Sequence, residues 1–133
     1  SDWSSDVCSS DLGEAIDSCI YLTMWADGKS VMTVEGLKGP NGELSPIQKA
    51  FIEEAAVQCG FCTPGLIMSA VEIVGTGKKY NREELKKLIS GHLCRCTGYE
   101  NILNAMERIV EEVYKVHKQP LVKADRRVKA HKE

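Results

Sequence analysis

The stretch Cys59-Gly60-Phe61-Cys62-Thr63-Pro64 decides how this chain is interpreted, together with Cys94-Arg95-Cys96. Thirty-one residues separate Cys62 from Cys94. Thiolates at such short spacing can converge on one soft metal centre, because cysteine sulfur suits zinc, copper(I) and iron–sulfur clusters. Two such pairs supply the four ligands that either a tetrahedral zinc ion or a [2Fe–2S] cluster requires. We therefore expect the four cysteines to bind a metal centre, and their spacing alone leaves both metals open.

Four segments of the chain begin with a helix-start signal and continue with an amphipathic pattern. The signals are Ser45-Pro46-Ile47-Gln48, Thr63-Pro64, Asn81-Arg82-Glu83-Glu84 and Thr97-Gly98-Tyr99-Glu100. The apolar faces that follow are Ile47, Ala50, Phe51 and Ala55; Leu66, Ile67, Ala70, Val71 and Val74; Leu85, Leu88 and Ile89; and Ile102, Met106, Ile109, Val110 and Val113. Four such helices with short connections are typical of an antiparallel bundle. The sequence therefore predicts a mainly α fold, with a four-helix metal-binding domain over residues 43–116.

The cysteines fall near the ends of these predicted helices. Cys59 is expected to end the first helix, Cys62 to precede the second, and Cys94 and Cys96 to precede the fourth. Unpaired N–H groups at a helix N-terminus, with the positive end of the helix dipole, favour bound negative charge and lower a thiol pKa. A zinc tetrathiolate and an oxidised four-thiolate [2Fe–2S] cluster are both dianionic. These helix ends therefore favour metal binding without selecting the metal.

Residues 13–38 have a β-like pattern. Cys19–Trp25 is rich in strand-forming residues, Asp27-Gly28 is typical of a two-residue turn, and Ser30–Val34 fits a second strand. Because an isolated hairpin is marginally stable in water, we expect it to pack on another element or to be the remnant of a larger sheet.

The two ends of the chain differ from its body in composition. Eight of the first twelve residues are Ser or Asp, and such a segment buries too little surface to offset its ordering entropy. Residues 1–12 also resemble translated sequencing adaptor, so we expect a disordered, non-native segment and give Cys8 no role.

The C-terminal end is basic, whereas the rest of the chain is acidic. Residues 115–133 hold seven Lys/Arg and two Asp/Glu, whereas residues 1–114 hold ten Lys/Arg and seventeen Asp/Glu. No aromatic residue interleaves the basic ones, so we expect residues 117–133 to be a solvated tail or linker and not a nucleic-acid site.

Neither a membrane span nor a secretion signal is apparent. No apolar run approaches the roughly 18–20 residues needed to cross a bilayer, and no basic patch followed by an apolar stretch opens the chain. We expect a cytoplasmic, reducing location with no membrane partner, where clustered cysteines are more often metal ligands than disulfides. A disulfide-stabilised binding domain is disfavoured for the same reason. His92 is expected to make a helix-end contact, and His117 and His131 lie in the basic tail, so no histidine is a candidate catalyst.

Read with their neighbours, the two cysteine motifs resemble one known family. Gln58-Cys59-Gly60-Phe61-Cys62-Thr63-Pro64-Gly65 and Leu93-Cys94-Arg95-Cys96-Thr97-Gly98-Tyr99 are similar to the iron–sulfur subunit of the molybdenum hydroxylases, which include xanthine dehydrogenase, aldehyde oxidoreductase and carbon monoxide dehydrogenase. The similarity runs from about Asp17 to Glu112. It implies that one [2Fe–2S] cluster is held by Cys59, Cys62, Cys94 and Cys96. It also implies that Gln58 and the Cys96 loop contact the molybdopterin of the partner subunit.

The resemblance further implies a function and partners. The chain would relay electrons from a molybdopterin centre during oxidation of a purine, aldehyde or similar substrate, with no catalytic acid or base of its own. Its partner would be the molybdopterin-binding catalytic subunit, with a FAD subunit as a second candidate. Of the ferredoxin-domain cysteines that precede this domain in the family, only Cys19 has a match, which implies an N-terminally truncated chain with Cys19 as a half-buried orphan thiol. The alternative is a protein-interaction module stapled by zinc on the same four cysteines, which would be colourless.

Overall fold

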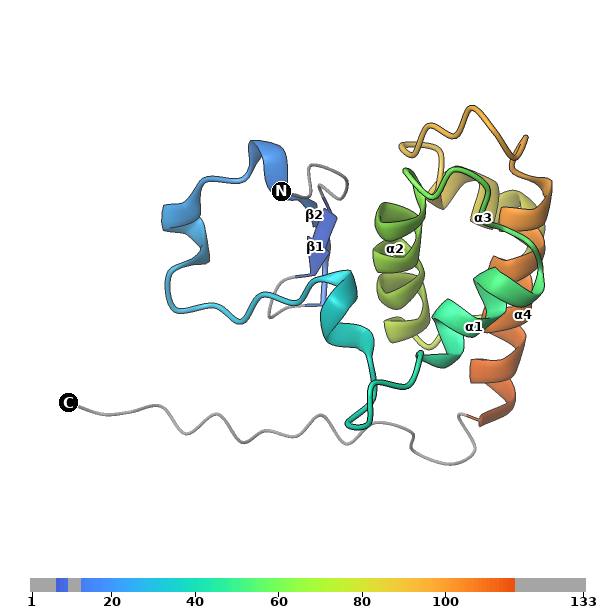
Figure 1. Ribbon diagram of the computed structural model, residues 1–133, viewed down its shortest axis with the longest axis horizontal. Helices are drawn as coiled ribbons and strands as arrows, with labels where there is room; N and C mark the ends of the chain where they lie inside the picture. Colours follow the sequence, from blue (N-terminus) through green and yellow to red (C-terminus); the bar gives the residue numbers. More distant parts are fainter. Residues whose placement is uncertain (1–6, 10–12, 117–133) are drawn as a thin grey trace.

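Four α-helices provide most of the regular secondary structure of the computed structural model, which describes residues 7–9 and 13–116 (Figure 1). They are α1 (Pro46–Glu53), α2 (Thr63–Gly75), α3 (Arg82–Leu88) and α4 (Glu100–Val116). They follow two short strands, β1 (Val7–Ser9) and β2 (Ala15–Asp17), and three 3₁₀ helices, η1 (Ser18–Ile20), η2 (Thr23–Ala26) and η3 (Val34–Leu37). The prediction of a mainly α chain with four helices is confirmed.

Two of the helices start at the capping boxes that the sequence predicts. At α1, the Gln48 N–H donates to the Ser45 hydroxyl at 3.3 Å and the Ser45 N–H donates to the Gln48 side chain at 2.9 Å. At α3, Asn81 and Glu84 make the same reciprocal pair, with both bonds at 2.9 Å. Each box satisfies two N–H groups that a helix start otherwise leaves unpaired. The Gln48 amide also donates to the Val34 carbonyl at 3.4 Å, which ties η3 to α1.

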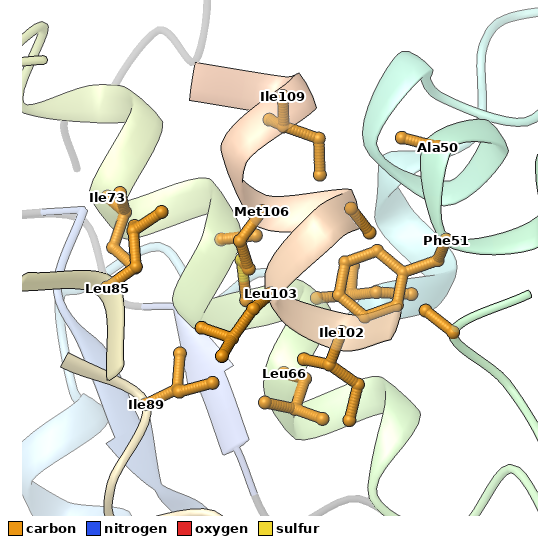
Figure 2. Close-up of a cluster of buried hydrophobic side chains, with 14 of the residues drawn as sticks. Ala50, Phe51, Leu66, Ile73, Leu85, Ile89, Ile102, Leu103, Met106 and Ile109 are labelled. Carbon is orange, nitrogen blue, oxygen red and sulfur yellow. The ribbon is translucent and has the colours of Figure 1, made fainter. Parts of the chain in front are cut away.

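The hydrophobic core lies around α4, which packs against the other three helices. Figure 2 shows its side chains meeting those of α1, α2 and α3. The buried apolar residues that form this cluster are Ala50, Phe51, Ala56, Leu66, Ile67, Ala70, Ile73, Leu85, Ile89, Ile102, Leu103, Ala105, Met106, Ile109 and Val110. Because α4 contacts each of the other helices, it helps to fix the positions of the loops that join them.

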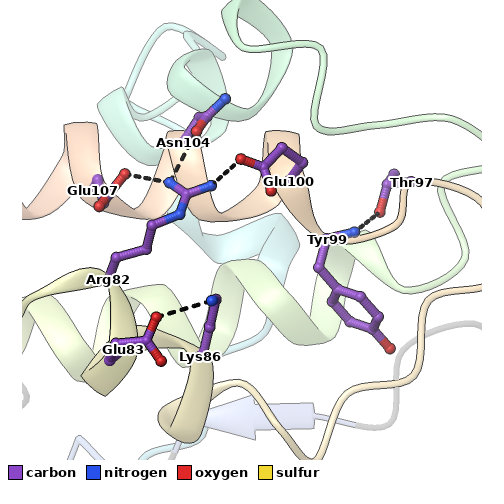
Figure 3. A network of polar contacts seen from close by, with 8 residues as sticks. All are labelled: Arg82, Glu83, Lys86, Thr97, Tyr99, Glu100, Asn104 and Glu107. Carbon is purple, nitrogen blue, oxygen red and sulfur yellow. Dashed lines mark hydrogen bonds and ion pairs between the residues drawn. The ribbon is translucent and has the colours of Figure 1, made fainter.

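An arginine holds the start of α3 against α4. Arg82 pairs with Glu100 at 2.6 Å and with Glu107 at 2.5 Å, and its guanidinium donates to the Asn104 amide oxygen at 3.0 Å (Figure 3). The pairs are partly exposed, so each contributes modestly to stability. Their fixed fork geometry nevertheless sets the register of α3 on α4. The start of α3 is thereby held against the first two turns of α4.

The first helix is shorter than predicted. α1 ends at Glu53 because Ala55 has a left-handed backbone (φ 52°) and the Ala56 N–H donates to the Phe51 carbonyl at 2.8 Å. Ala55 is therefore exposed and Ala56 is buried in its place. Cys59, expected to end this helix, lies in the loop beyond it. Leu88 was expected to point inward from α3, and this is also wrong, because Leu88 is 47% exposed.

The predicted hairpin of residues 19–34 is not formed. Cys19–Trp25 folds into η1 and η2, and no strand covers Ser30–Val34. Local bonds satisfy part of the backbone instead: the Trp25 N–H donates to Leu22 O at 2.9 Å and the Lys29 N–H to Ala26 O at 3.0 Å. A strand needs a neighbour for its N–H and C=O groups. Among the described residues these strand-forming residues have no such neighbour, so 3₁₀ turns replace the strands.

A different strand pair occurs at the start of the described residues. β1 pairs antiparallel with β2, with Val7 opposite Asp17 and Ser9 opposite Ala15. The Ala15 N–H donates to the Glu72 carboxylate at 3.2 Å, which joins β2 to α2. No regular structure was expected in residues 1–12, so β1 differs from that prediction; a main-chain ladder does not depend on apolar side chains. The rest of that segment and the predicted tail, with His117 and His131, lie outside the described residues.

Across residues 7–9 and 13–116, no helix combines the length and the apolar character needed to pass through a lipid bilayer.

Candidate metal centre

The cysteine motifs occupy two connections at the same end of the helices (Figure 1). Cys59 and Cys62 lie between α1 and α2, and Cys94 and Cys96 lie between α3 and α4. Gly60 has a left-handed backbone (φ 82°), which allows the chain to turn sharply between the first two thiols. The backbone of both connections is irregular, so each thiol is placed by a loop whose ends are fixed by packed helices.

The four thiols meet in two pairs, with one thiol from each loop in either pair. The Cys62 thiol interacts with that of Cys94, and the Cys59 thiol with that of Cys96. Cys62 and Cys94 are half-buried, whereas Cys59 and Cys96 are exposed, and all four are free of disulfide bonds. One thiol of each motif therefore lies beside one of the other, and the joint binding of one centre by all four stays a prediction. We refer to Cys62 and Cys94 as the inner pair and to Cys59 and Cys96 as the outer pair.

The inner pair is electrostatically unequal. Burial, followed by the interactions with the Cys94 thiol, raises the pKa of Cys62 to about 11. Burial also raises the pKa of Cys94, but hydrogen bonds from the Thr97 side chain, the Thr97 and Cys96 N–H groups and Cys62 outweigh it and give a pKa of about 7. In the outer pair, the hydrogen bond with Cys59 raises the pKa of Cys96. Cys94 therefore ionises most readily of these three thiols, and a thiolate is the form that binds metal.

A dense set of hydrogen bonds shapes the loop around Cys94. The Thr97 hydroxyl lies 3.0 Å from Cys94 Sγ, and the Thr97 N–H donates to the same sulfur at 3.5 Å. The Tyr99 hydroxyl accepts from the Cys94 N–H at 2.8 Å and donates to the His92 carbonyl at 3.1 Å. Gly98 and Tyr99 both have left-handed backbones (φ 65° and 68°), which fold the chain back before α4. This turn places the ring of Tyr99 against the loop that carries Cys94.

His92 contributes to the structure at the end of α3. Its N–H donates to the Ile89 carbonyl at 3.0 Å, in agreement with the expected helix-end contact. Its ring Nε2 lies 2.6 Å from the Ser69 hydroxyl on α2. Burial lowers the pKa of His92, so the neutral imidazole is favoured at pH 7. Sequence reasoning missed Ser69, although a lone hydroxyl in the apolar stretch of α2 is a signal that could have identified it.

The two thiol pairs supply the number of ligands that a two-iron cluster needs. In a [2Fe–2S] cluster with four cysteine ligands, each iron takes two thiolates, so the ligands are needed as two pairs. Within the part of the chain that the structure describes, no three His, Cys, Asp or Glu side chains are grouped closely enough to hold one metal ion. The inner and outer pairs together match this number of ligands.

The family described as "[2Fe-2S] binding domain" matches residues 33–107, which include all four of these cysteines. The chain belongs to this [2Fe-2S]-binding domain family. A [2Fe–2S] cluster is therefore the cofactor of the domain, and the resemblance drawn from the two motifs is confirmed.

Named relatives of this [2Fe-2S]-binding domain are subunits of oxidoreductases. The chain is 47% identical over 96 residues to the xanthine dehydrogenase iron-sulfur-binding subunit of Escherichia coli O157:H7, covering 71% of this chain and 60% of the relative. It is 47% identical over 94 residues to the nicotine 6-hydroxylase small subunit of Paenarthrobacter nicotinovorans, covering 71% and 56%. The chain thus spans less than two thirds of the length of these curated relatives.

Two solved structures share the fold. Quinoline 2-oxidoreductase from Pseudomonas putida 86 superposes with a TM-score of 0.76 at 36% identity, over 87% of this chain and 69% of that one. Aldehyde oxidoreductase from Desulfovibrio gigas superposes with a TM-score of 0.74 at 32% identity, over 86% of this chain and 12% of the larger one. At these identities the likeness extends beyond the fold to the family.

Exposed side chains adjoin three of the motif cysteines in the sequence of the [2Fe-2S]-binding domain. Gln58, the predicted molybdopterin contact, is exposed next to Cys59. Phe61 is 67% exposed and Leu93 is 86% exposed, and each adjoins a cysteine of the inner pair in sequence. Large apolar side chains with so much exposure at one site mark a surface that another molecule can cover. One exposed amide and two exposed apolar side chains thus lie next to motif cysteines in the sequence.

Proposed function

We propose that this chain is the electron-transfer module of a molybdenum-dependent hydroxylase or dehydrogenase, with one [2Fe–2S] cluster held by Cys59, Cys62, Cys94 and Cys96. The observation that carries the proposal is the meeting of the four thiols in two pairs, one thiol of each pair coming from each loop. When bound, such a cluster takes up one electron and passes it to the next carrier. The relatives named as xanthine dehydrogenase and nicotine 6-hydroxylase subunits support this assignment.

The two thiol pairs have different roles in this proposal. The half-buried inner pair fixes the centre to the helical core, since Cys62 and Cys94 both pack against the buried cluster of α4. The exposed outer pair brings the centre to the surface, where an electron has the shortest path to a partner. Gln58 lies on this exposed side, next to Cys59. This position supports a contact of Gln58 and the Cys96 loop with the molybdopterin of the catalytic subunit.

We propose that the molybdopterin-binding subunit covers the surface formed by Gln58, Phe61 and Leu93. Interfaces are most apolar at their buried centre, and aromatic side chains are enriched there. Phe61 supplies such a side chain within the first cysteine motif, and Leu93 supplies a second apolar group beside the other motif. A FAD subunit would take electrons further along the relay. The substrate would be a purine, an aldehyde or a similar molecule bound by the catalytic subunit.

The domain boundaries and location belong to the same proposal. Residues 43–116 would be the four-helix cluster-binding domain, and residues 13–38 the edge of a ferredoxin-like domain. Cys19 is exposed on η1, not half-buried as expected, and is a single thiol there. The free thiols of Cys19 and the four motif cysteines fit a reducing compartment such as the cytoplasm.

Anaerobic reconstitution with iron and sulfide tests the ligand assignment. The wild-type chain is expected to turn brown and to retain iron and sulfide after desalting. Four variants are each expected to lose most of the iron and sulfide, because one loop cannot supply the ligand that the other has lost. These are Cys59→Ser, Cys62→Ser, Cys94→Ser and Cys96→Ser. Cys19→Ser is the matched control and should load like the wild type.

Two results would count against this assignment. Full iron content in Cys94→Ser would show that another group completes the ligand set. A colourless wild-type chain that binds zinc and no sulfide would favour the zinc-stapled interaction module instead.

A further inference from the structure

We propose that Thr97 sets the reduction potential of the metal centre by donating a hydrogen bond from its hydroxyl to the sulfur of Cys94. This inference rests on the proposed function, in which Cys94 is a cluster ligand. The hydroxyl oxygen of Thr97 lies 3.0 Å from Cys94 Sγ, within the range for a hydrogen bond to sulfur. No role for Thr97 follows from the cysteine spacing, so this residue is an addition to the site.

The direction of this hydrogen bond is fixed by chemistry. A metal-bound cysteine is a thiolate, which has no proton to donate. The oxygen of Thr97 already accepts a hydrogen bond from the Tyr99 N–H at 3.2 Å (Figure 3). Its own hydroxyl proton is therefore free to point at Cys94 Sγ. The Thr97 N–H, 3.5 Å from the same sulfur, adds a second donor.

The Thr97 hydroxyl is already held in position before the cluster is reduced. Threonine is β-branched, so few side-chain rotamers are accessible to it. The left-handed turn at Gly98 and Tyr99 fixes the backbone on one side of Thr97. On the other side, the Tyr99 hydroxyl holds the Cys94 N–H at 2.8 Å. A donor aligned in this way needs no reorganisation to stabilise a negative sulfur.

Thr97 acts on one thiol pair only. Among Cys59, Cys62, Cys94 and Cys96, only the sulfur of Cys94 lies within hydrogen-bond distance of a side-chain hydroxyl of the described residues. The sulfur it contacts belongs to the half-buried inner pair, where the surroundings screen charge less than at the exposed outer pair. The effect of one hydrogen bond on a charged sulfur is largest at such a position. Thr97 is thus placed where it influences the metal centre most.

The expected consequence is a higher reduction potential. In a reductive titration, one electron passes from a chemical reductant to the cluster, and no covalent bond forms or breaks. The reduced cluster carries one more negative charge, shared with the thiolate sulfurs, so a donor to sulfur stabilises it more than the oxidised form. Removing the hydroxyl should make reduction about tenfold less favourable, which corresponds to about 59 mV for a one-electron couple.

The test compares three variants of the reconstituted chain. Thr97→Val removes the hydroxyl and keeps the β-branched shape, Thr97→Ser keeps the hydroxyl, and Thr63→Val makes the same change beside Cys62. Iron and sulfide content are measured first, and the reduction potential is then determined by titration followed by visible absorption and electron paramagnetic resonance. Thr97→Val should keep its iron and show the lower potential. Thr97→Ser and Thr63→Val should match the wild type.

The sign of the shift separates this role from a loosened loop. A loop that opens exposes the cluster to water, which stabilises the more charged reduced form and raises the potential. A raised or unchanged potential in iron-loaded Thr97→Val would overturn the inference, as would an equal drop in Thr97→Ser. If Thr97→Val fails to hold iron while Thr97→Ser holds it, the hydroxyl is needed for assembly and the inference is also wrong. Failure of the proposed function would appear separately, as full iron content in Cys94→Ser.

Discussion

Replacement of Tyr99 by Phe should destabilise the loop that carries Cys94. The change removes only the hydroxyl, which accepts from the Cys94 N–H at 2.8 Å and donates to the His92 carbonyl at 3.1 Å. A hydrogen bond of this kind contributes about 0.5–1.5 kcal/mol net, and two of them give roughly 1–3 kcal/mol. The loop is part-buried, so water can replace one partner and the lower half of this range is expected. The free energy of unfolding should therefore fall by about 1–2 kcal/mol.

Thermal unfolding of the reconstituted protein under argon, followed by far-ultraviolet circular dichroism, measures this change. For a domain of this size about 1 kcal/mol shifts the unfolding midpoint by roughly 4–8 °C, so Tyr99→Phe should lower it by about 5–15 °C. Tyr80→Phe is the control, because the Tyr80 hydroxyl bonds the Thr76 hydroxyl at 3.0 Å at an exposed position. Its effect should stay within about 0.5 kcal/mol. Equal midpoints for the two variants would refute the reasoning.

Three further variants test the core, the buried histidine and the partner surface. Phe51→Ala should lower the free energy of unfolding by about 3–5 kcal/mol in urea titration, because Phe51 is fully buried, while Ile52→Ala at the 59% exposed neighbouring position should change it far less; similar losses would contradict the assigned core. Burial lowers the pKa of His92 in the folded chain, so the unfolded chain gains this proton first and stability should fall as the pH drops below about 6.5. His92→Asn should flatten this decline of stability with falling pH. An unchanged slope would show that His92 does not cause the decline. Gln58→Ala should leave the cluster spectrum intact and slow electron transfer from the molybdenum subunit in stopped-flow measurements, whereas an unchanged rate would argue against the pterin contact.

Helix starts could be predicted because their causes are local. Ser45 with Gln48, and Asn81 with Glu84, are each three residues apart, and both pairs form the capping boxes that the sequence indicates. The end of α1 could not be predicted in the same way. It depends on Ala55, a residue that seldom takes a left-handed backbone, and on Ala56 packing into the core.

The hairpin prediction was wrong because a strand depends on tertiary contacts that its own sequence does not contain. Strand propensity reports how well side chains fit a pleated surface, and it does not supply the neighbouring strand. Without a partner among the described residues, Cys19–Trp25 satisfies its backbone in 3₁₀ turns. The same limit applies to the metal centre. The motifs predict a shared centre for four thiols, but the donors to Cys94 depend on the backbone turn at Gly98 and Tyr99, which returns Thr97 to the sulfur.

Iron and acid-labile sulfide per chain, measured on the reconstituted wild type, test the central claim most directly. One cluster on Cys59, Cys62, Cys94 and Cys96 predicts about two iron and two sulfide per chain, with a single reduced-state signal by electron paramagnetic resonance. About one zinc without sulfide would contradict the cluster assignment. About four iron with two distinct signals would show that cysteines beyond these four also bind a cluster.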